Sequence, residues 1–359
     1  MRSVIVASLV LGQALAADRT LGFKAKPTVE NRTLDEIYKA ALAEGGVVTL
    51  WHGGDEPDQL KPLQDTFEGR FPGMKLNVTV DLSKYFGGRI DQQLANNNVH
   101  VDNVMLQTVH DFPRWAREDA LLNYAPLGFD QVHPALKDSL SGSWYAVEII
   151  FWKNIWSTKK LPGAKFDSFQ SFLDPEYKDK LVLTYPSDDD AVLFAFDQIM
   201  QDHGVAWFDK LLAQNPTWVR GTETPLTLIS QPNNSLAATF TTSIGFADIP
   251  DIATAFPNDG LFTSWGQRGA ILKDAPHPEG AKLLASFMLS SEFQDSMGWS
   301  VLQDVEPPAG LPQIMRMNNT NVVAFNYWME DRANVERLRL FFEDRIGTSQ
   351  GKSPLLDDI

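Results

Sequence analysis

Residues 269–294 read GAILKDAPHPEGAKLLASFMLSSEFQ, and this stretch decides the fold class. Its apolar residues 270–272 predict a short strand. Pro278 suits the first turn of a helix, and Glu279 beside it is favourable at the positive end of the helix dipole. Ser290 and Ser291 end that helix and start another. One face of the first helix is predicted to be buried, because apolar residues recur there at helical spacing: Ala281, Leu284, Phe287 and Met288.

The same succession of strands and helices continues through the rest of the chain. A capping box, TLDE at 33–36, opens a helix that glycines 45 and 46 close. Strands and helices then alternate, which predicts mostly parallel sheets with right-handed crossovers. The run WYAVEIIFWKNIW at 144–156 exceeds one ordinary strand, so we expect it to cross between two lobes. Residues 321–346 are predicted to form one helix, and 347–359 to be loosely ordered.

Length, charge and the N-terminus indicate the class of protein. The 359 residues exceed one comfortable core and suggest two lobes, while the net charge of −15 argues against a nucleic-acid partner. An apolar run, 4–15, follows Arg2 and ends at a signal-peptidase site before Ala17. No other segment is apolar enough for a membrane anchor, so we expect a secreted protein, extracellular or periplasmic.

Two features of composition bear on the secretory route. The chain has no cysteine, which excludes disulfides, a lipid-anchored N-terminal cysteine and a thiol nucleophile. Four sequons are a mild indication of a eukaryotic route and predict glycosylation at Asn31, Asn77, Asn233 and Asn318.

Three further segments occur in a characteristic order before the opening stretch: EDALLNYAPLGFD (118–130), SWYAVEIIFWKNIWSTKKLP (143–162) and LDPEYKDKLVLTYPSDDD (173–190). Together the four segments resemble bacterial extracellular solute-binding proteins, especially the ferric-iron-binding group of ABC transporter substrate-binding proteins. The resemblance implies an α/β, type II periplasmic-binding-protein fold, with two lobes of mostly parallel sheets flanked by helices and a ligand cleft between them. The implied organisation is a signal peptide at 1–16, a first lobe from 17–146 and 258–359, and a second lobe from 147–257.

Ligands of open α/β sheets bind at the carboxyl ends of strands and at helix N-termini. This rule, with the implied fold, gives eleven candidate ligand-binding residues. They are His52, Gly53, Ser83, Tyr85, Gln107 and Thr108 in the first lobe, Glu148 in the crossing strand, and Asp188, Arg220, Thr241 and Thr242 in the second lobe.

Each candidate also has a purely structural interpretation. The glycines suit an ordinary turn, and the acids at 188–190 suit a helix cap. If those acids face the cleft they favour a cation, whereas Arg220 would clamp a carboxylate or phosphate. The sequence therefore leaves the sign of the ligand open. An isolated Glu148 among apolar neighbours must pair, hydrogen-bond or face the cleft, because burying it alone costs several kcal/mol.

The resemblance raises the question of iron. Ferric-binding members of the group supply adjacent tyrosines after the last strand of the second lobe, and this chain has Thr241 and Thr242 there. Neutral hydroxyls are poor ligands for a hard ferric ion, and the histidines show no metal-ligand spacing. We therefore predict no metal site and no cofactor.

The leading functional hypothesis is a monomeric, non-catalytic binding protein that closes over a small molecule or metal chelate. An organic cation, a carboxylate and a sugar-like molecule are all compatible, and an ABC transporter is the expected partner if the source is bacterial. One alternative is an enzyme on the same fold with unidentified catalytic residues, since sequence order alone cannot assemble a Ser-His-acid triad. Another is an interaction protein that has lost its small ligand.

Overall fold

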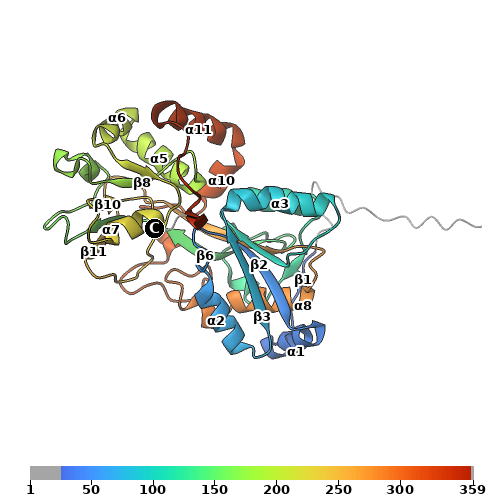
Figure 1. Cartoon of the computed structure of the whole chain (residues 1–359). Coiled ribbons are helices and arrows are strands. Elements are labelled where there is room, and N and C mark those ends of the chain that lie inside the picture. The colour runs from blue at the N-terminus through green and yellow to red at the C-terminus, as the bar shows by residue number, and fades with distance from the viewer. Residues whose placement is uncertain (1–25, 357–359) are drawn as a thin grey trace, which may run out of the picture.

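A computed structural model describes residues 26–356 as two lobes side by side (Figure 1). The expected signal peptide at 1–16 lies outside the described residues. Within the described range, no helix is both long enough and apolar enough to cross a membrane.

The first lobe is built on a mixed sheet in the order β3-β2-β4-β12-β6. β2 pairs in parallel with β3 and β4, and β12 pairs antiparallel with β4 and β6. β1 (Thr28–Val29) pairs separately with β5 (Tyr124–Ala125). The strands of the large sheet are β2 (Val47–Gly53), β3 (Lys75–Asp81), β4 (Asn103–Leu106), β6 (Tyr145–Phe151) and β12 (Ser264–Ile271).

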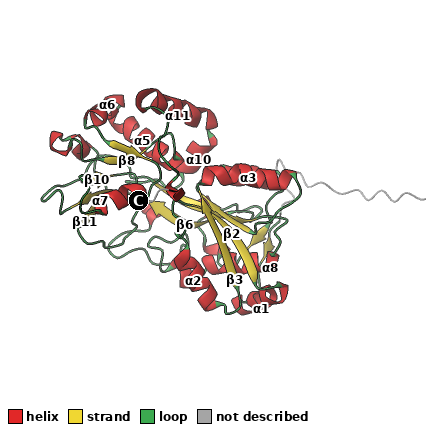
Figure 2. Cartoon of the chain, viewed as in Figure 1, coloured by secondary structure: helices red, strands yellow, loops and turns green. Residues whose placement is uncertain are grey.

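Helices cover both faces of this sheet (Figure 2). The predicted capping box is present, since the Thr33 side chain accepts from the backbone of Glu36, whose own side chain accepts from Thr33. α3 begins at Ser83, directly after the end of β3. The helices of this lobe are α1 (Leu34–Glu44), α2 (Lys61–Arg70), α3 (Ser83–Ala95), α4 (Asp111–Arg117), α8 (Pro278–Met288) and α9 (Ser291–Gln294).

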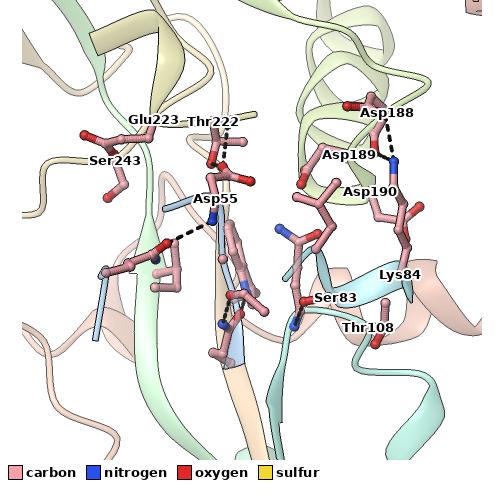
Figure 3. A pocket seen from close by; sticks show the side chains of 18 of the residues that line it. Asp55, Ser83, Lys84, Thr108, Asp188, Asp189, Asp190, Thr222, Glu223 and Ser243 are labelled. Atoms are coloured by element: carbon pink, nitrogen blue, oxygen red, sulfur yellow. Dashed lines mark hydrogen bonds and ion pairs between the residues drawn. The ribbon is translucent and has the colours of Figure 1, made fainter. Parts of the chain in front are cut away.

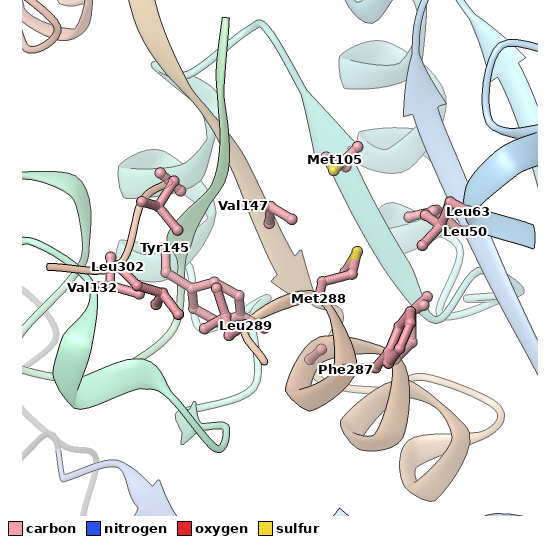
Figure 4. Packing of buried hydrophobic residues seen from close by; sticks show 14 of the residues in the cluster. Leu50, Leu63, Met105, Val132, Tyr145, Val147, Phe287, Met288, Leu289 and Leu302 are labelled. Atoms are coloured by element: carbon pink, nitrogen blue, oxygen red, sulfur yellow. The ribbon is translucent and has the colours of Figure 1, made fainter. Parts of the chain in front are cut away.

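The opening stretch of sequence forms β12, α8 and α9, and it anchors the core of this lobe. α8 packs on α1 and β2, with Phe287 and Met288 against the sheet in Figure 4. Burying a side chain of this size contributes about 1.5–3 kcal/mol. Gly280 permits the close contact, because a Cβ there would lie 2.6 Å from the carbonyl oxygen of Val47.

The second lobe repeats the strand order of the first. β8 and β9 pair in parallel, a single bridge joins Leu181 to Ala238, and β7 pairs antiparallel with β10 and β11, giving β9-β8-β10-β7-β11. The strands are β7 (Asn154–Ser157), β8 (Val182–Thr184), β9 (Thr217–Val219), β10 (Ala238–Thr239) and β11 (Ile252–Ala255). The helices are α5 (Asp190–His203), α6 (Val205–Ala213) and α7 (Thr224–Ser230).

Two connections join the sheets. The chain leaves β6 and enters β7, and it returns from β11 to β12, so the predicted crossing at 144–156 is confirmed. These four strands connect the lobes directly, without a crossover helix, and they run antiparallel to their neighbours. Each sheet is therefore mixed, whereas the sequence predicted mostly parallel sheets.

The C-terminal helices lie on the second lobe. The predicted helix at 321–346 is divided at Asp331 into α10 (Ala324–Glu330) and α11 (Arg332–Ile346). Both pack on α5, and apolar side chains from both are buried in that lobe's core, although the sequence placed all of 258–359 in the first lobe. The buried side chains of α10 and α11 are Phe325, Met329, Val335 and Phe342. We therefore propose lobe limits of 26–151 and 264–320 for the first lobe, and of 152–263 and 321–356 for the second.

The C-terminal tail, residues 347–356, contacts the second lobe at two points, although most of its residues are exposed. The Ser349 and Ser187 hydroxyls lie 3.2 Å apart. Pro354 is buried against Gly221, where the backbone has φ +79° and an added Cβ would lie 2.6 Å from the Cβ of Pro354. The tail therefore ends near the start of α7, as Figure 1 shows.

All four asparagines predicted to carry glycans have exposed side chains: Asn31, Asn77, Asn233 and Asn318. Asn77 lies on β3, at the edge of its sheet. Glycosylation of these residues remains a prediction.

Candidate functional site

A cavity of about 150 Å³ lies between the lobes (Figure 3). Its walls come from loops after β2 and β4 and the start of α3 on the first lobe, and from the starts of α5 and α7 on the second. Six of the eleven candidate residues line it: Gly53, Ser83, Gln107, Thr108, Glu148 and Asp188.

The floor of the cavity is formed by adjacent strands at the junction of the lobes. Glu148 on β6 is paired in register with Gln267 on β12, and Ile150 with Trp265. The Trp265 indole donates to the Gln267 side chain at 3.1 Å, and it packs edge-on against Trp152 with ring centroids 5.7 Å apart. The floor therefore presents one carboxyl group beside two indole rings.

The Glu148 carboxyl carries no salt bridge to any described residue. Burial, the one cause that acts on it, raises the pKa of Glu148 to about 7 from the usual 4.5. Of the three outcomes expected from sequence, the structure has the third, because Glu148 faces the cavity.

Three more carboxyl groups form a row across the upper wall, with Asp55 between Glu223 and Asp189 (Figure 3). Asp189 caps α5 by accepting from the backbone of Ala191 and Val192 at 2.8 and 2.9 Å. Burial, and then the charge of Asp55, raises the pKa of Asp189 to about 7 and that of Glu223 to about 7. The carboxyl groups of Asp55, Asp189 and Glu223, which we call the acidic row, therefore lie close enough for their charges to repel one another.

Asp55 also joins the two lobes. It extends from the first lobe and accepts from the Thr222 backbone at 2.6 Å and from the Thr222 hydroxyl at 2.7 Å. These charge-assisted hydrogen bonds hold the lobes together on one side of the cavity.

A second bridge between the lobes centres on Asp188. Lys84 donates to its carboxylate at 2.7 Å and to its carbonyl at 2.6 Å, and Arg220 donates to the carboxylate at 2.9 and 3.2 Å. Burial opposes ionisation, but the Arg220 hydrogen bond and the Lys84 charge outweigh it and lower the pKa of Asp188. Arg220 also reaches the Tyr85 hydroxyl at 3.4 Å. Arg220 and Tyr85 thus belong to this bridge and do not line the cavity.

The remaining three candidates are buried beside the cavity without lining it. His52 is 1% exposed, and neither ring nitrogen has a hydrogen-bond partner among the described residues. Burial lowers the pKa of His52 to about 4 and keeps the ring neutral. Thr241 accepts from the Thr184 backbone at 3.0 Å, and the Thr242 hydroxyl is buried without a described partner.

Gly53 has a specific structural role at the cavity wall. A Cβ on Gly53 would lie 1.8 Å from the Ser83 hydroxyl oxygen, which itself accepts from the Gln107 backbone at 3.0 Å. The glycine therefore allows the loop after β2 to lie against the start of α3.

Sequence reasoning left several lining residues out of the candidate set. Asp55 and Asp189 stand next to candidates in the loops GGD and DDD, so those loops carried a usable signal. Glu223 and Trp265 carried none, because a glutamate before a short helix and a tryptophan in a strand are common. Others that line the cavity are Gly54, Gln59, Leu82, Lys84, Ile150, Trp152, Asp190, Thr222, Ser243 and Gln267.

The ionisable groups that line the cavity are mostly acidic. Six carboxyl groups line it, against the single ammonium of Lys84, which is paired with Asp188. Asp190 pairs with Arg339. The described residues contain no group of three or more histidine, cysteine, aspartate or glutamate side chains arranged to hold a metal ion.

Two lobes with this strand order and a cavity at their junction define a two-lobed binding-protein architecture, and solved structures share it. A substrate-binding protein of an ABC transporter from Agrobacterium tumefaciens is 14% identical with a TM-score of 0.69, over 83% of this chain and 93% of that one. Iron-bound HitA from Pseudomonas aeruginosa is 14% identical with a TM-score of 0.62, over 82% and 99%. A putative spermidine/putrescine ABC transporter protein from Listeria monocytogenes is 19% identical with a TM-score of 0.56, over 83% and 99%.

These similarities confirm the predicted type II periplasmic-binding-protein fold. No protein-family model matches the chain, and no curated protein matches it in sequence. At these identities the likeness establishes the fold, and the ligand must be argued from the residues of the cavity.

Proposed function

We propose that this chain is a secreted, non-catalytic solute-binding protein whose two lobes close over a small organic cation. The observation that carries the proposal is the imbalance of charge in the cavity. Four of the six carboxyl groups have no salt bridge to a cationic side chain in the described part of the chain: Asp55, Glu148, Asp189 and Glu223. Transfer of an unpaired charge into such a site is unfavourable, and a bound cation would compensate for it.

The helix N-termini at the cavity support a cation over an anion. A helix N-terminus ordinarily favours an anion, because its backbone N–H groups point outward. At α5, however, Asp189 already accepts from two of those groups. Glu223, at the cap position of α7, adds a further negative charge. A phosphate or carboxylate ligand would therefore meet like charge at both helices.

Aromatic rings on the floor support the same ligand class. Trp152 and Trp265 both line the cavity. A tryptophan face attracts a cation by about 0.5–2 kcal/mol, and it also packs against apolar parts of a ligand. Carboxyl groups together with indole rings favour an organic cation over a hydrated metal ion.

The other functional hypotheses receive less support. An interaction protein without a ligand would fill its cleft, whereas this cleft contains a lined cavity. For an enzyme, the one candidate histidine, His52, is buried outside the cavity lining, and neither of its nitrogens has a hydrogen-bond partner among the described residues. We further propose that the protein acts as a monomer and, in a bacterial source, delivers its ligand to an ABC transporter.

A thermal-shift screen of the secreted protein tests the ligand class. The panel contains amines, amino acids, organic acids, sugar phosphates and ferric citrate at matched ionic strength. A ligand at 100 times its Kd adds about 2.7 kcal/mol of stability, so a cognate cation should raise the melting temperature by several degrees. Shifts produced by anions alone, or no shift from any amine, would overturn the cationic assignment.

A further inference from the structure

The cavity is lined by a row of three carboxyl groups, by the carboxyl group of Glu148 on its floor, and by apolar side chains on the same floor. On this basis, and resting on the cation-binding function proposed above, we propose that the ligand is a short diamine: two ammonium groups joined by a methylene chain. One ammonium group binds at the acidic row of Asp55, Asp189 and Glu223, and the other binds at Glu148.

The separation of the two positions is visible in the electrostatics. Asp189 and Glu223 each have their pKa raised by the charge of Asp55, so these three carboxyl groups lie within reach of one another. No other carboxyl group acts on the pKa of Glu148, which is raised by burial alone. Glu148 also comes from strand β6, whereas the carboxyl groups of the row come from the loop after β2 and from the starts of α5 and α7. The cavity therefore holds two anionic positions rather than one diffuse cluster.

The surface of the floor beyond Glu148 is apolar. Ile150 follows Glu148 by two residues on β6, and Trp265 is its partner on β12, so both lie on the same face as Glu148 and Gln267. Trp152 continues this surface toward the second lobe. A methylene chain contacts such side chains favourably, whereas a compact inorganic cation would leave them unused.

An unsatisfied polar group in the wall indicates that a ligand belongs there. Thr108 lines the cavity and is 4% exposed, yet its hydroxyl has no hydrogen-bond partner among the described residues. Buried hydroxyls are nearly always hydrogen-bonded in native proteins. An ammonium group has three donors, so a ligand that carries one can satisfy an acceptor of this kind.

The size of the cavity restricts the length of the ligand. A volume of about 150 Å³ is close to that of an engineered protein cavity that binds benzene, a molecule of six heavy atoms. 1,4-Diaminobutane also has six heavy atoms. A short diamine fits this space, and a long polyamine would have to extend out through the mouth.

Calorimetric titration of the full-length secreted protein at pH 8 tests the inference. The probes are 1,4-diaminobutane, 1-aminobutane as the monoamine of equal chain length, and 1,4-butanediol as the neutral analogue. We expect the diamine to bind at least tenfold more tightly than the monoamine, because a charged hydrogen-bonding partner is lost in the latter. The diol should not bind measurably.

Two variants and a control locate the two ends of the ligand. Glu148→Gln should reduce the affinity for the diamine to about that of the monoamine, and Glu223→Gln, at the other anionic position, should weaken the binding of both amines. Glu336→Gln, at an exposed site on α11, should change neither. Melting curves of each variant identify any that fails to fold, in which case the other variant decides.

The outcomes distinguish the two levels of the proposal. Equal affinity for the diamine and the monoamine would overturn the diamine assignment and leave a cation-binding protein. Failure of both amines to bind, with binding of an anion or no binding at all, would overturn the proposed function itself.

Discussion

The substitution Glu148→Gln should stabilise the ligand-free protein at alkaline pH and leave it unchanged at acid pH. The folded chain holds the pKa of Glu148 at about 7, against 4.5 for an ordinary glutamate. That difference corresponds to about 3 kcal/mol of unfavourable free energy when the carboxyl group is ionised in the folded state. Because the group faces the cavity, solvent reduces this penalty, and we expect about 1–2 kcal/mol to be recovered by the amide.

The sign of the pH dependence follows from the raised pKa. Below pH 4.5 the carboxyl group is protonated in both folded and unfolded chains and costs nothing. As the pH rises toward 7 the unfolded chain ionises first, so the wild-type protein loses stability over this interval. The variant lacks this loss. The difference in melting temperature should therefore be near zero at pH 4.5 and reach about 1–3 °C at pH 8.

Scanning calorimetry of the ligand-free wild type, Glu148→Gln and Glu336→Gln, at pH values from 4.5 to 8, measures this difference. Glu336 is exposed on α11, so its variant should follow the wild type throughout. A Glu148→Gln protein that is less stable than the wild type at pH 8, or equally displaced at every pH, would refute the assignment of Glu148 as a buried, unpaired carboxyl group.

Three other predictions follow from the bridge between the lobes, the tail and the acidic cavity. Lys84→Met removes one of the two cations paired with Asp188. The ligand-free variant should therefore shift toward an open form with a larger radius of gyration, measured by X-ray scattering. An unchanged radius of gyration would contradict a role of Lys84 in closure of the lobes. Gly221→Ala should lower the free energy of unfolding by at least about 1 kcal/mol more than the control Gly163→Ala. Both glycines have φ near +80°, but an added Cβ is crowded only at 221, by Pro354. Equal losses of stability in urea titrations would exclude that contact. The affinity for a diamine should rise about tenfold or more between pH 5.5 and 8. A cation binds the ionised form of the carboxyl groups, and three of them have pKa values of about 7, so they ionise over this interval. Calorimetric titrations that show tighter binding at acid pH would contradict this prediction.

The fold was largely predictable from sequence because its signals are local. The capping box at Thr33, the proline at the start of α8 and the alternation of strands and helices each act within a few residues. The placement of α10 and α11 could not be predicted in this way. An apolar helix face in the sequence does not indicate which lobe it packs on. The packing of α10 and α11 into the core of the second lobe becomes apparent only in the folded chain.

The site was predictable in part for a related reason. Loops at the ends of strands lead to the cleft in this fold, which located Gly53, Ser83 and Asp188. A loop does not reveal which of its side chains point inward, so His52 was predicted to line the cavity although it turns into the protein interior. The charge partners of Arg220 were equally hidden, since Asp188 is 32 residues away and Tyr85 is 135 away in sequence. Ion pairs of this kind decide the sign of the charge in the cavity, and they form only in the folded chain.

The seating of Pro354 against Gly221 has a practical consequence for work on this protein. The final described residues lie against the loop that carries Thr222, which donates hydrogen bonds to Asp55 of the other lobe. A purification tag attached directly after residue 356 would begin within a few residues of that contact, and a polyhistidine tag would add titratable charge beside an acidic cavity. Removing residues 347–356 to aid crystallisation would also remove a support of the ligand-binding loop. Measurements of affinity should therefore keep residues 347–356 and place any tag away from them.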